Sequence, residues 1–215
     1  MKKKLRLEEF ITSQTTISRR KLLTLIKEGK VTVNGQKVDH LAMEIMSHRD
    51  VVKIEKKQIK KVHDYVYFKL YKPKGMLTTM TDTKERQCIG DIIRKKQLSV
   101  IPVGRLDRNT TGLIFLTNDG DFAQFISHPK NKITKTYNVS LNNSLTKSDM
   151  TRLEKGIILE DGPLQCQSFN MIDTNQVRMT ISEGRNRIIR RAFEHLGYEV
   201  TTLKRISVGG VDLGD

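Results

Sequence analysis

Residues 104–112 form a polar, turn-rich stretch between two short apolar runs. The runs, Val100-Ile101-Pro102-Val103 and Leu113-Ile114-Phe115-Leu116, are short and β-branched enough to be buried strands. Strands at both ends hold this stretch as a loop, with Asp107 near its centre. An arginine lies within two positions of Asp107 on either side, and a nearby cation favours the charged form of an acid. The loop is therefore expected to present an ionised carboxylate that can act as a base or a nucleophile.

The complete string of residues around this loop is more specific than its Asp alone. Gly104-Arg105-Leu106-Asp107 is followed by Thr110-Thr111-Gly112-Leu113 and then by Leu116-Thr117-Asn118-Asp119-Gly120. Asp also has a structural use in turns, where its side chain hydrogen-bonds the backbone nearby. The whole string, however, resembles the catalytic motif of the ribosomal pseudouridine synthases of the RsuA type. In that family the Asp is essential, so the resemblance implies a catalytic role for Asp107.

The charge of the chain is unevenly distributed. Its 215 residues carry a formal net charge of +15, and residues 1–61 hold 16 Lys and Arg against 7 Asp and Glu. One charged run is usually a solvated surface, but an asymmetry of this size favours a nucleic-acid-binding part near the N-terminus.

The N-terminal quarter has the pattern of a small helix-plus-hairpin unit. Its expected elements are helices over 5–13 and 18–28, strands over 31–33 and 36–38 joined by an Asn-Gly turn, and a strand over 51–54. The unit resembles the RNA-binding domain first described in ribosomal small-subunit protein four, in which a basic helix and the adjoining loop contact the RNA backbone. The matching positions are Arg19, Arg20, Lys21, Lys27 and Lys30. Solubility alone is the alternative use of these charges.

The highly charged segment 53–63 is interpreted as a linker in its middle, which predicts an RNA-binding domain over 1–60 and a catalytic domain over 61–215. In the second domain we expect a strand over 65–70 ended by Lys72-Pro73-Lys74-Gly75, helices over 119–127, 146–156 and 188–196, and strands over 133–141, 164–172, 176–182 and 200–208. Strands outnumber helices and few strand-helix-strand crossovers occur. The expected fold is therefore α+β, with a mixed, mostly antiparallel sheet.

Two later segments match the same family. Tyr137 matches the position whose ring stacks on the target base and whose hydroxyl helps to remove the C5 proton, although a strand tyrosine is more often a core residue. In segment 184–191 the family has an arginine that pairs with the catalytic Asp, here Arg190; a phosphate-binding patch is the alternative. Ile188 stands where family members commonly carry Gln. The arginines expected to contact RNA in this domain are Arg105, Arg185 and Arg187.

The resemblance implies isomerisation of a specific uridine in ribosomal RNA to pseudouridine. The stretches Ser127-His128-Pro129 and Leu159-Glu160-Asp161-Gly162 are more similar to members that act on large-subunit RNA. Small-subunit RNA is the alternative substrate. A non-catalytic RNA-binding or ribosome-assembly protein is the alternative from another class.

The sequence indicates no cofactor and no metal site, because Cys88 and Cys166 are the only cysteines and no His cluster accompanies them. We expect a reduced cytoplasmic protein, because the cysteines are few and neither a secretory h-region nor a membrane-spanning run occurs. A monomer is also expected. Family members usually continue past the position of Asp215, so a truncated or short member is expected.

Overall fold

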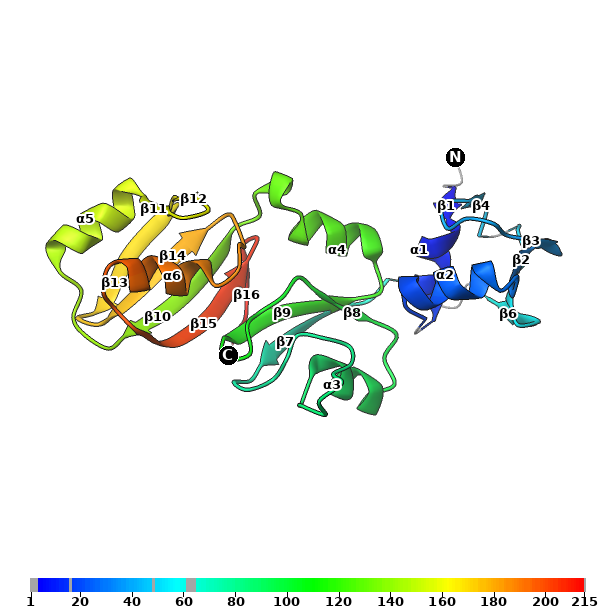
Figure 1. Ribbon diagram of the computed structural model, residues 1–215, viewed down its shortest axis with the longest axis horizontal. Coiled ribbons are helices and arrows are strands. Elements are labelled where there is room, and N and C mark those ends of the chain that lie inside the picture. The colour runs from blue at the N-terminus through cyan, green and yellow to red at the C-terminus, as the bar shows by residue number, and fades with distance from the viewer. Residues whose placement is uncertain (1–3, 16, 48, 61–64, 215) are drawn as a thin grey trace.

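The computed structural model describes residues 4–15, 17–47, 49–60 and 65–214, and its elements fall into a small N-terminal unit and a larger unit (Figure 1). Among the described residues, the buried members of one core all lie between Leu7 and Ile54, and those of the two other clusters lie between Met76 and Val208. The predicted division between residues 60 and 61 lies beside residues 61–64, which are outside the described residues. It therefore remains a prediction.

The N-terminal unit combines two helices with short strands. Its elements are β1 (Leu5–Arg6), α1 (Leu7–Gln14), α2 (Arg19–Lys27), β2 (Val31–Val33), β3 (Gln36–Lys37), β4 (Glu44–Ile45), β5 (Val52–Ile54) and β6 (Lys57–Ile59). Helix α2 begins where predicted, because the Ser18 hydroxyl accepts a hydrogen bond from the Lys21 backbone N–H at 3.2 Å. It buries Leu22, Leu25 and Ile26 and leaves its basic residues in solvent.

The interpretation of the middle of segment 53–63 as a linker was wrong, because residues 57–59 form strand β6. Strand β6 pairs with β5 in an antiparallel hairpin, and Glu55 and Lys56 form the turn with φ of 48° and 71°. Two positive φ values suit the type I′ turn, which matches the twist of the flanking strands. The pairing is favoured because Val52 and Ile54 are buried and Ile59 packs against the same core. The charged side chains between them face solvent, so composition alone suggested a linker. Residues 61–63 lie outside the described residues.

The larger unit is built on a mixed sheet. Its strands are β7 (Tyr67–Lys72), β8 (Ile101–Val103), β9 (Thr111–Thr117), β10 (Lys135–Leu141), β11 (Ile157–Leu159), β12 (Gly162–Leu164), β13 (Ser168–Asp173), β14 (Gln176–Ile181), β15 (Val200–Val208) and β16 (Val211–Asp212). Its helices are α3 (Ile89–Lys95), α4 (Gly120–Ser127), the short 3-10 helix η1 (Pro129–Asn131), α5 (Lys147–Lys155) and α6 (Ile188–His195).

The main path of the sheet runs β13-β14-β10-β15-β9-β7, with β16 beside β15 and β8 beside β9. Among the strand pairs of the described residues, β9 with β15 is the only parallel one, so the predicted α+β class with a mostly antiparallel sheet is confirmed. Helix α6 packs its apolar face, including Ala192 and Phe193, into the largest core (Figure 1). Around β9, Leu113 and Phe115 belong to a smaller cluster that includes Ala123 of α4, while Ile114 and Leu116 join the main core.

Most predicted elements occur within a few residues of their expected bounds, and β15 has the predicted limits. The strand expected over 164–172 is instead divided, because β12 ends at Leu164 and β13 begins at Ser168. Leu164 completes a two-stranded sheet of β11 and β12, whereas β13 extends the main sheet. Within the described residues, no helix is long and apolar enough to cross a membrane.

Candidate active site

The Asp107 loop joins β8 to β9 and is fixed by its backbone. The Thr110 backbone N–H donates to the Asp107 backbone carbonyl at 3.0 Å, which closes a turn that begins at Asp107. At the other end of the loop, Gly112 has a φ of 102° and lies against β15. A Cβ at this position would come within 2.1 Å of the Arg205 carbonyl oxygen. Only glycine allows β9 and β15 to approach this closely, and that approach brings the Asp107 loop next to β15.

Lys72 anchors the same loop from the opposite side. Its side chain is fully buried, and its ammonium donates to the carbonyls of Pro73, Met76 and Arg108 at 3.0, 2.8 and 3.2 Å. The Gly75 backbone N–H also donates to the Arg108 carbonyl, at 2.8 Å. Burial lowers the pKa of Lys72 to about 8, and the negative charge of Asp107 partly opposes that shift. The Lys-Pro-Lys-Gly turn that ends β7 therefore holds the residue next to Asp107.

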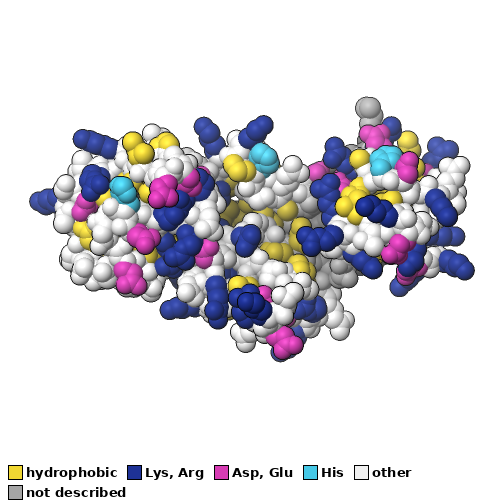
Figure 2. All heavy atoms as spheres, in the orientation of Figure 1, with side chains coloured by type: hydrophobic (Ala, Val, Ile, Leu, Met, Phe, Trp, Pro, Cys, Tyr) yellow, Lys and Arg dark blue, Asp and Glu magenta, His cyan; other side chains and the backbone are white. Residues whose placement is uncertain are grey.

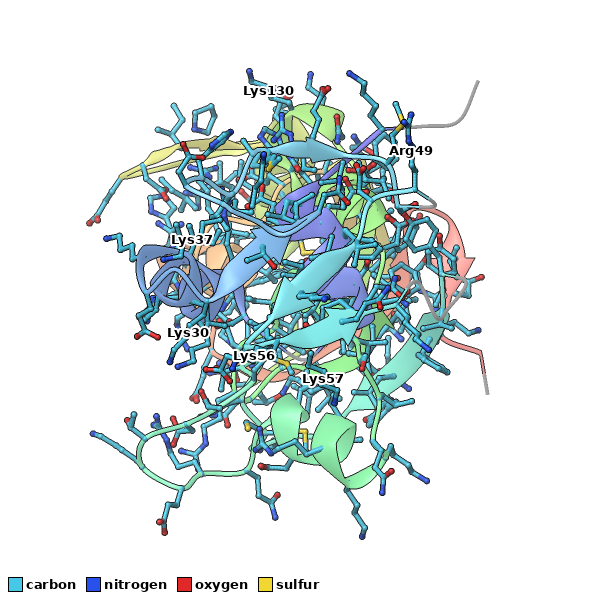
Figure 3. The ribbon with its side chains drawn as sticks, turned by 90° about the vertical axis from the view of Figure 1, so that its right-hand side faces the viewer. Lys30, Lys37, Arg49, Lys56, Lys57 and Lys130 are labelled. Atoms are coloured by element: carbon cyan, nitrogen blue, oxygen red, sulfur yellow. The ribbon has the colours of Figure 1, made fainter. Side chains whose placement is uncertain are left out.

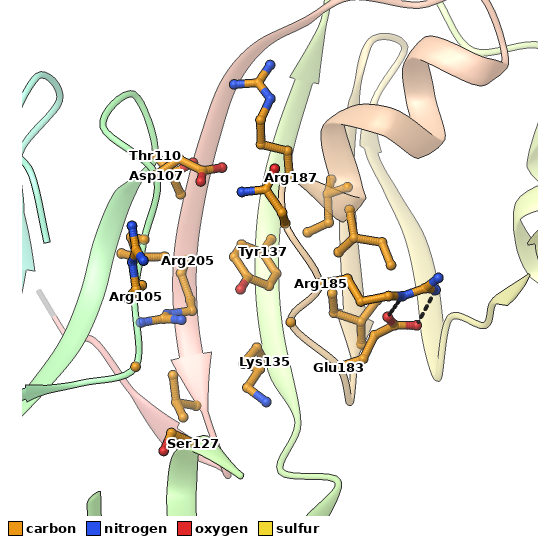
Figure 4. A pocket seen from close by; sticks show the side chains of 18 of the residues that line it. Arg105, Asp107, Thr110, Ser127, Lys135, Tyr137, Glu183, Arg185, Arg187 and Arg205 are labelled. Atoms are coloured by element: carbon orange, nitrogen blue, oxygen red, sulfur yellow. Dashed lines mark hydrogen bonds and ion pairs between the residues drawn. The ribbon is translucent and has the colours of Figure 1, made fainter. Parts of the chain in front are cut away.

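A cavity of about 680 Å³ opens beside Asp107. Its walls come from the Asp107 loop, from β10 and β15, and from the loop before α6. Figure 4 shows side chains from these elements around one space. Of the predicted site residues, Arg105, Asp107, Tyr137, Arg185 and Arg187 line the cavity. The fold thus brings together segments that are far apart in the sequence.

Tyr137 is 8% exposed and lies on β10, directly opposite Arg205 of β15. Its strand alternates buried and partly buried residues, as the sequence predicted. Part of the ring packs in the main core while the residue also lines the cavity. Core packing and site lining are therefore both properties of this tyrosine.

Arg190 lies near Asp107 but is not paired with it. Its Nη1 donates to the Val200 carbonyl at 2.8 Å, and its Nε is buried without a partner in the described part of the chain. Burial and the nearby Arg187 lower the pKa of Arg190, whereas the charge of Asp107 acts in the opposite direction. Thr110 Oγ1 is likewise buried without a partner. Such unsatisfied atoms are uncommon, because buried polar groups in proteins nearly always have a hydrogen-bond partner.

Arg185 is held by the protein itself. Its guanidinium pairs with Glu183 and Asp161, at 2.9 Å in the second case, and donates to the carbonyls of Gly162 and Pro163 at 3.1 and 2.7 Å. Arg191 also pairs with Asp161, at 2.8 Å. These contacts tie the β11–β12 hairpin to the loop before α6. Contact between Arg185 and RNA remains a prediction.

The predicted RNA-binding residues of the N-terminal unit lie on or just after α2, and all are exposed. Arg19 pairs with Glu8 at 2.9 Å, and Lys30 pairs with Glu28 and Glu55 at 2.8 and 3.1 Å. Within the described residues, Arg20, Lys21 and Lys27 form no ion pair. Figure 3 shows further cations at this end of the molecule, and Figure 2 shows Lys and Arg spread over the visible face of both units. The labelled ones in this unit are Lys30, Lys37, Arg49, Lys56 and Lys57.

Comparison with known proteins identifies the larger unit. The sequence pattern of RNA pseudouridylate synthases matches residues 66–195, which is more than half of the chain. The chain belongs to this family. The S4 domain pattern matches residues 5–47 of this pseudouridine synthase, so both resemblances seen in the sequence are confirmed.

Relatives of this pseudouridine synthase match along nearly all of it. Ribosomal large subunit pseudouridine synthase B of Bacillus subtilis is 38% identical, covering 98% of this chain and 90% of the relative. The protein of the same name from Vibrio cholerae is 34% identical, covering 91% of this chain and 64% of the relative. A solved crystal structure of a pseudouridylate synthase superimposes with a TM-score of 0.66 at 30% identity, covering 98% and 91% of the two chains.

Sequence reasoning missed three basic residues at the site of this pseudouridine synthase: Lys72, Lys135 and Arg205. Lys135 lies two positions before Tyr137, and the period of two in a strand would have placed both on one face. Arg205 had no such signal, because its position beside Tyr137 depends on the register of β10 and β15. Among the described residues, no cluster of three or more His, Cys, Asp or Glu is arranged to hold a metal ion.

Proposed function

We propose that this pseudouridine synthase isomerises a specific uridine of large-subunit ribosomal RNA, with Asp107 as the catalytic carboxylate. The observation that carries the proposal is the position of Asp107 on an anchored loop, at a cavity that Tyr137 and several cations also line. The substrate assignment is supported by the names of the Bacillus and Vibrio relatives. Such a reaction belongs in the cytoplasm, where ribosomes assemble, and a monomer suffices for it.

The chemistry needs a carboxylate and neither redox change nor group transfer to a second molecule. The bond between ribose C1′ and uracil N1 breaks, the base turns, and a bond forms between C1′ and C5, so that C5 loses a proton and N1 gains one. Breaking the first bond builds positive charge on the ribose, which a carboxylate stabilises, traps, or relieves by taking a ribose proton. Hydrolytic glycosidases need a second carboxylate to activate water, whereas here the detached base itself returns. One Asp is therefore enough.

Tyr137 and Arg190 have separate roles in this proposal. The ring of Tyr137 stacks on the uracil after the uridine leaves its helix, and its hydroxyl assists loss of the C5 proton. Arg190 supplies the cation that pairs with Asp107 when RNA is bound, because hydrogen bonds at catalytic groups often tighten only in the complex. The unpartnered Nε of Arg190 is consistent with a contact that is completed on binding.

The N-terminal unit docks the enzyme on RNA through the exposed cations Arg19, Arg20, Lys21, Lys27 and Lys30. Arg105 and Arg187 extend that contact to the rim of the cavity, and Arg185 lies beside them. The match of residues 5–47 to the S4 domain supports this division of labour.

The test is to map pseudouridines in both ribosomal RNAs of a strain that lacks the gene. One pseudouridine in large-subunit RNA should disappear, the wild-type gene should restore it, and Asp107→Asn should not. Asp212→Asn is a matched control, because that exposed carboxylate lies on β16 away from the cavity. Loss of a small-subunit site would contradict the subunit assignment. Loss of no site would favour the non-catalytic ribosome-assembly role.

A further inference from the structure

Two cations lie beside Tyr137 at the cavity and have no role in the mechanism above. Arg205 on β15 is the direct cross-strand partner of Tyr137, and Lys135 precedes Tyr137 by two positions on β10. Both line the cavity, and Figure 4 shows Arg205 on the strand next to Tyr137 and Lys135 further along the strand that carries Tyr137. Directly opposite residues in a sheet are about 5 Å apart, and residues two apart along a strand are separated by roughly 7 Å. The three side chains therefore form one continuous surface.

Neither cation is neutralised by a carboxylate of the described chain. Arg205 is only 6% exposed, and its one reported side-chain hydrogen bond runs from Nε to the Leu113 carbonyl at 2.7 Å. A guanidinium carries five N–H donors, so the Nη groups retain donors for another partner. Lys135 is half-buried, and its side chain forms no hydrogen bond or ion pair within the described part of the chain. The negative charge of Glu183 acts to raise the pKa of Lys135, but Glu183 is already paired with Arg185.

Holding two such cations together has a cost in free energy. Burial is the main cause that lowers the pKa of Lys135, and the positive charge of Arg205 lowers it further. Buried charges are normally paired, because removing an ion from water is unfavourable unless another group compensates. An arrangement that keeps like charges close at a cavity is therefore suited to an anionic ligand.

The substrate limits the identity of that anion. The uracil base is neutral, and the anionic group of RNA is the phosphodiester. Resting on the proposed function, we propose that Lys135 and Arg205 bind one of the two phosphodiesters that flank the target uridine. The planar guanidinium of Arg205 suits two phosphate oxygens, and Lys135 adds a compact charge beside it. The contact fixes the ribose over the cavity while Tyr137 holds the base.

A purely structural role is the competing explanation for Arg205, whose Nε joins β15 to β9. That role does not extend to Lys135, which has no such bond. The two residues therefore test the inference independently. The variant Arg205→Lys keeps the positive charge but loses the Nε contact, so it separates the effect of the charge from that of the contact.

The experiment combines loss of a cation with loss of a phosphate charge. An RNA hairpin carrying the mapped uridine is made in three forms: with normal phosphates, with a neutral methylphosphonate 5′ of the uridine, and with one 3′ of it. All three carry the same 2′-O-methyl groups beside the altered linkages. Affinities are measured in the full-length Asp107→Asn enzyme, so that turnover does not intervene. Lys135→Met and Arg205→Met are compared with Lys204→Met, a neighbour on β15 whose ammonium lies 5.6 Å from the Tyr71 ring centroid and outside the cavity lining.

For the Asp107→Asn enzyme, which is the parent of the other variants, one of the two methylphosphonate RNAs should bind about tenfold more weakly than the normal RNA. The Lys204→Met variant should show the same loss. Lys135→Met and Arg205→Met should bind the normal RNA about as weakly and should no longer distinguish it from that methylphosphonate RNA. The slope of log K against log salt should also fall by about one. If either cavity variant discriminates the RNAs as strongly as the parent, the phosphate contact is wrong for that residue. Should Arg205→Met melt early, Lys135→Met carries this comparison, and Arg205→Lys, which keeps the charge and loses the Nε contact, should still distinguish the normal RNA from that methylphosphonate RNA.

Isomerisation of the normal hairpin, without 2′-O-methyl groups, by the unmutated enzyme is measured alongside. If the unmutated enzyme turns over the hairpin but Lys135→Met and Arg205→Met still distinguish the normal RNA from the methylphosphonate RNA, this inference is wrong and the proposed function stands. Absence of turnover in the hairpin and of the pseudouridine in the cell overturns the proposed function itself.

Discussion

The ammonium of Lys72 lies 3.2 Å from the carbonyl oxygen of Arg108, the residue that follows Asp107. Lys72 ends β7, and the two residues are 36 positions apart. Arg108 returns a contact, because its Nε donates to the Gly75 carbonyl at 3.1 Å. The position of the Asp107 loop therefore depends on a buried cation that belongs to another strand.

The first prediction concerns the pH dependence of stability. The pKa of Lys72 is about 8 in the folded chain against an ordinary value of 10.5. Between these values the unfolded chain binds a proton that the folded chain does not, so the free energy of unfolding rises with pH. The rise is at most about 1.4 kcal/mol per pH unit. The free energy of unfolding is measured in urea for wild type and Lys72→Met at pH 7.5, 8.5 and 9.5. The value for wild type minus the value for Lys72→Met should increase with pH. If this difference in free energy stays constant or falls with pH, burial does not lower the pKa of Lys72.

Much of the fold could be predicted from the sequence because its signals are local. Alternation of residue types defines β10 and places Tyr137 inward, and Ser18 marks the start of α2. The loop that carries Asp107 follows from turn residues between two apolar runs. Each of these depends on neighbours in the chain, which the sequence displays directly.

The remaining parts of the site depend on contacts between distant residues. The position of Arg205 beside Tyr137 requires the register of two strands that are separated by more than fifty residues of other elements. Arg185 was assigned to RNA because it lies in a basic loop, yet its partner Asp161 comes from the β11–β12 hairpin. Patterns of charge do not reveal which cation is already paired.

The second prediction separates the roles of Asp107 and Arg190. Asp107→Asn keeps the shape of the side chain and removes its charge, so folding and RNA affinity should stay near wild type while turnover is abolished. Arg190→Ala should also greatly reduce turnover, and Arg190→Lys should restore part of it if charge beside Asp107 is what matters. Turnover assays are read beside thermal melting. A large fall in melting temperature in both Arg190 variants would make its bond to the Val200 carbonyl the main role of this residue.

The third prediction concerns RNA docking. Arg20→Ala with Lys21→Ala should reduce the slope of log K against log salt by about 1–2, because each lost phosphate contact releases about one fewer counterion. The double variant Lys147→Ala with Lys155→Ala serves as the control, because it removes the same charge from the exposed first and last residues of α5. Equal slopes for the two double variants would contradict docking through α2.

The fourth prediction tests Asp161 as a positioning residue. Its carboxylate joins Arg185 to Arg191 and so holds the loop that lines the cavity. Asp161→Asn should lower kcat/KM by about tenfold or more, since small displacements of site residues are costly to turnover. Glu160→Gln, at the neighbouring exposed position, should have little effect. A normal kcat/KM in Asp161→Asn would show that the loop keeps its position without this contact.

The last prediction separates stacking from proton transfer at Tyr137. Phenylalanine retains the aromatic face and removes only the hydroxyl, so Tyr137→Phe should still bind RNA. If the hydroxyl assists loss of the C5 proton, this variant should release tritium from RNA labelled at uridine C5 much more slowly than wild type. Tyr137→Leu should in addition weaken binding of the flipped base by about 1–3 kcal/mol, the size of a stacking contact. Because Tyr137 is only 8% exposed and also packs in the main core, thermal melting of both variants is needed to separate binding from folding. Release of tritium at the wild-type rate by Tyr137→Phe would exclude the hydroxyl from proton removal and leave the ring as a stacking surface.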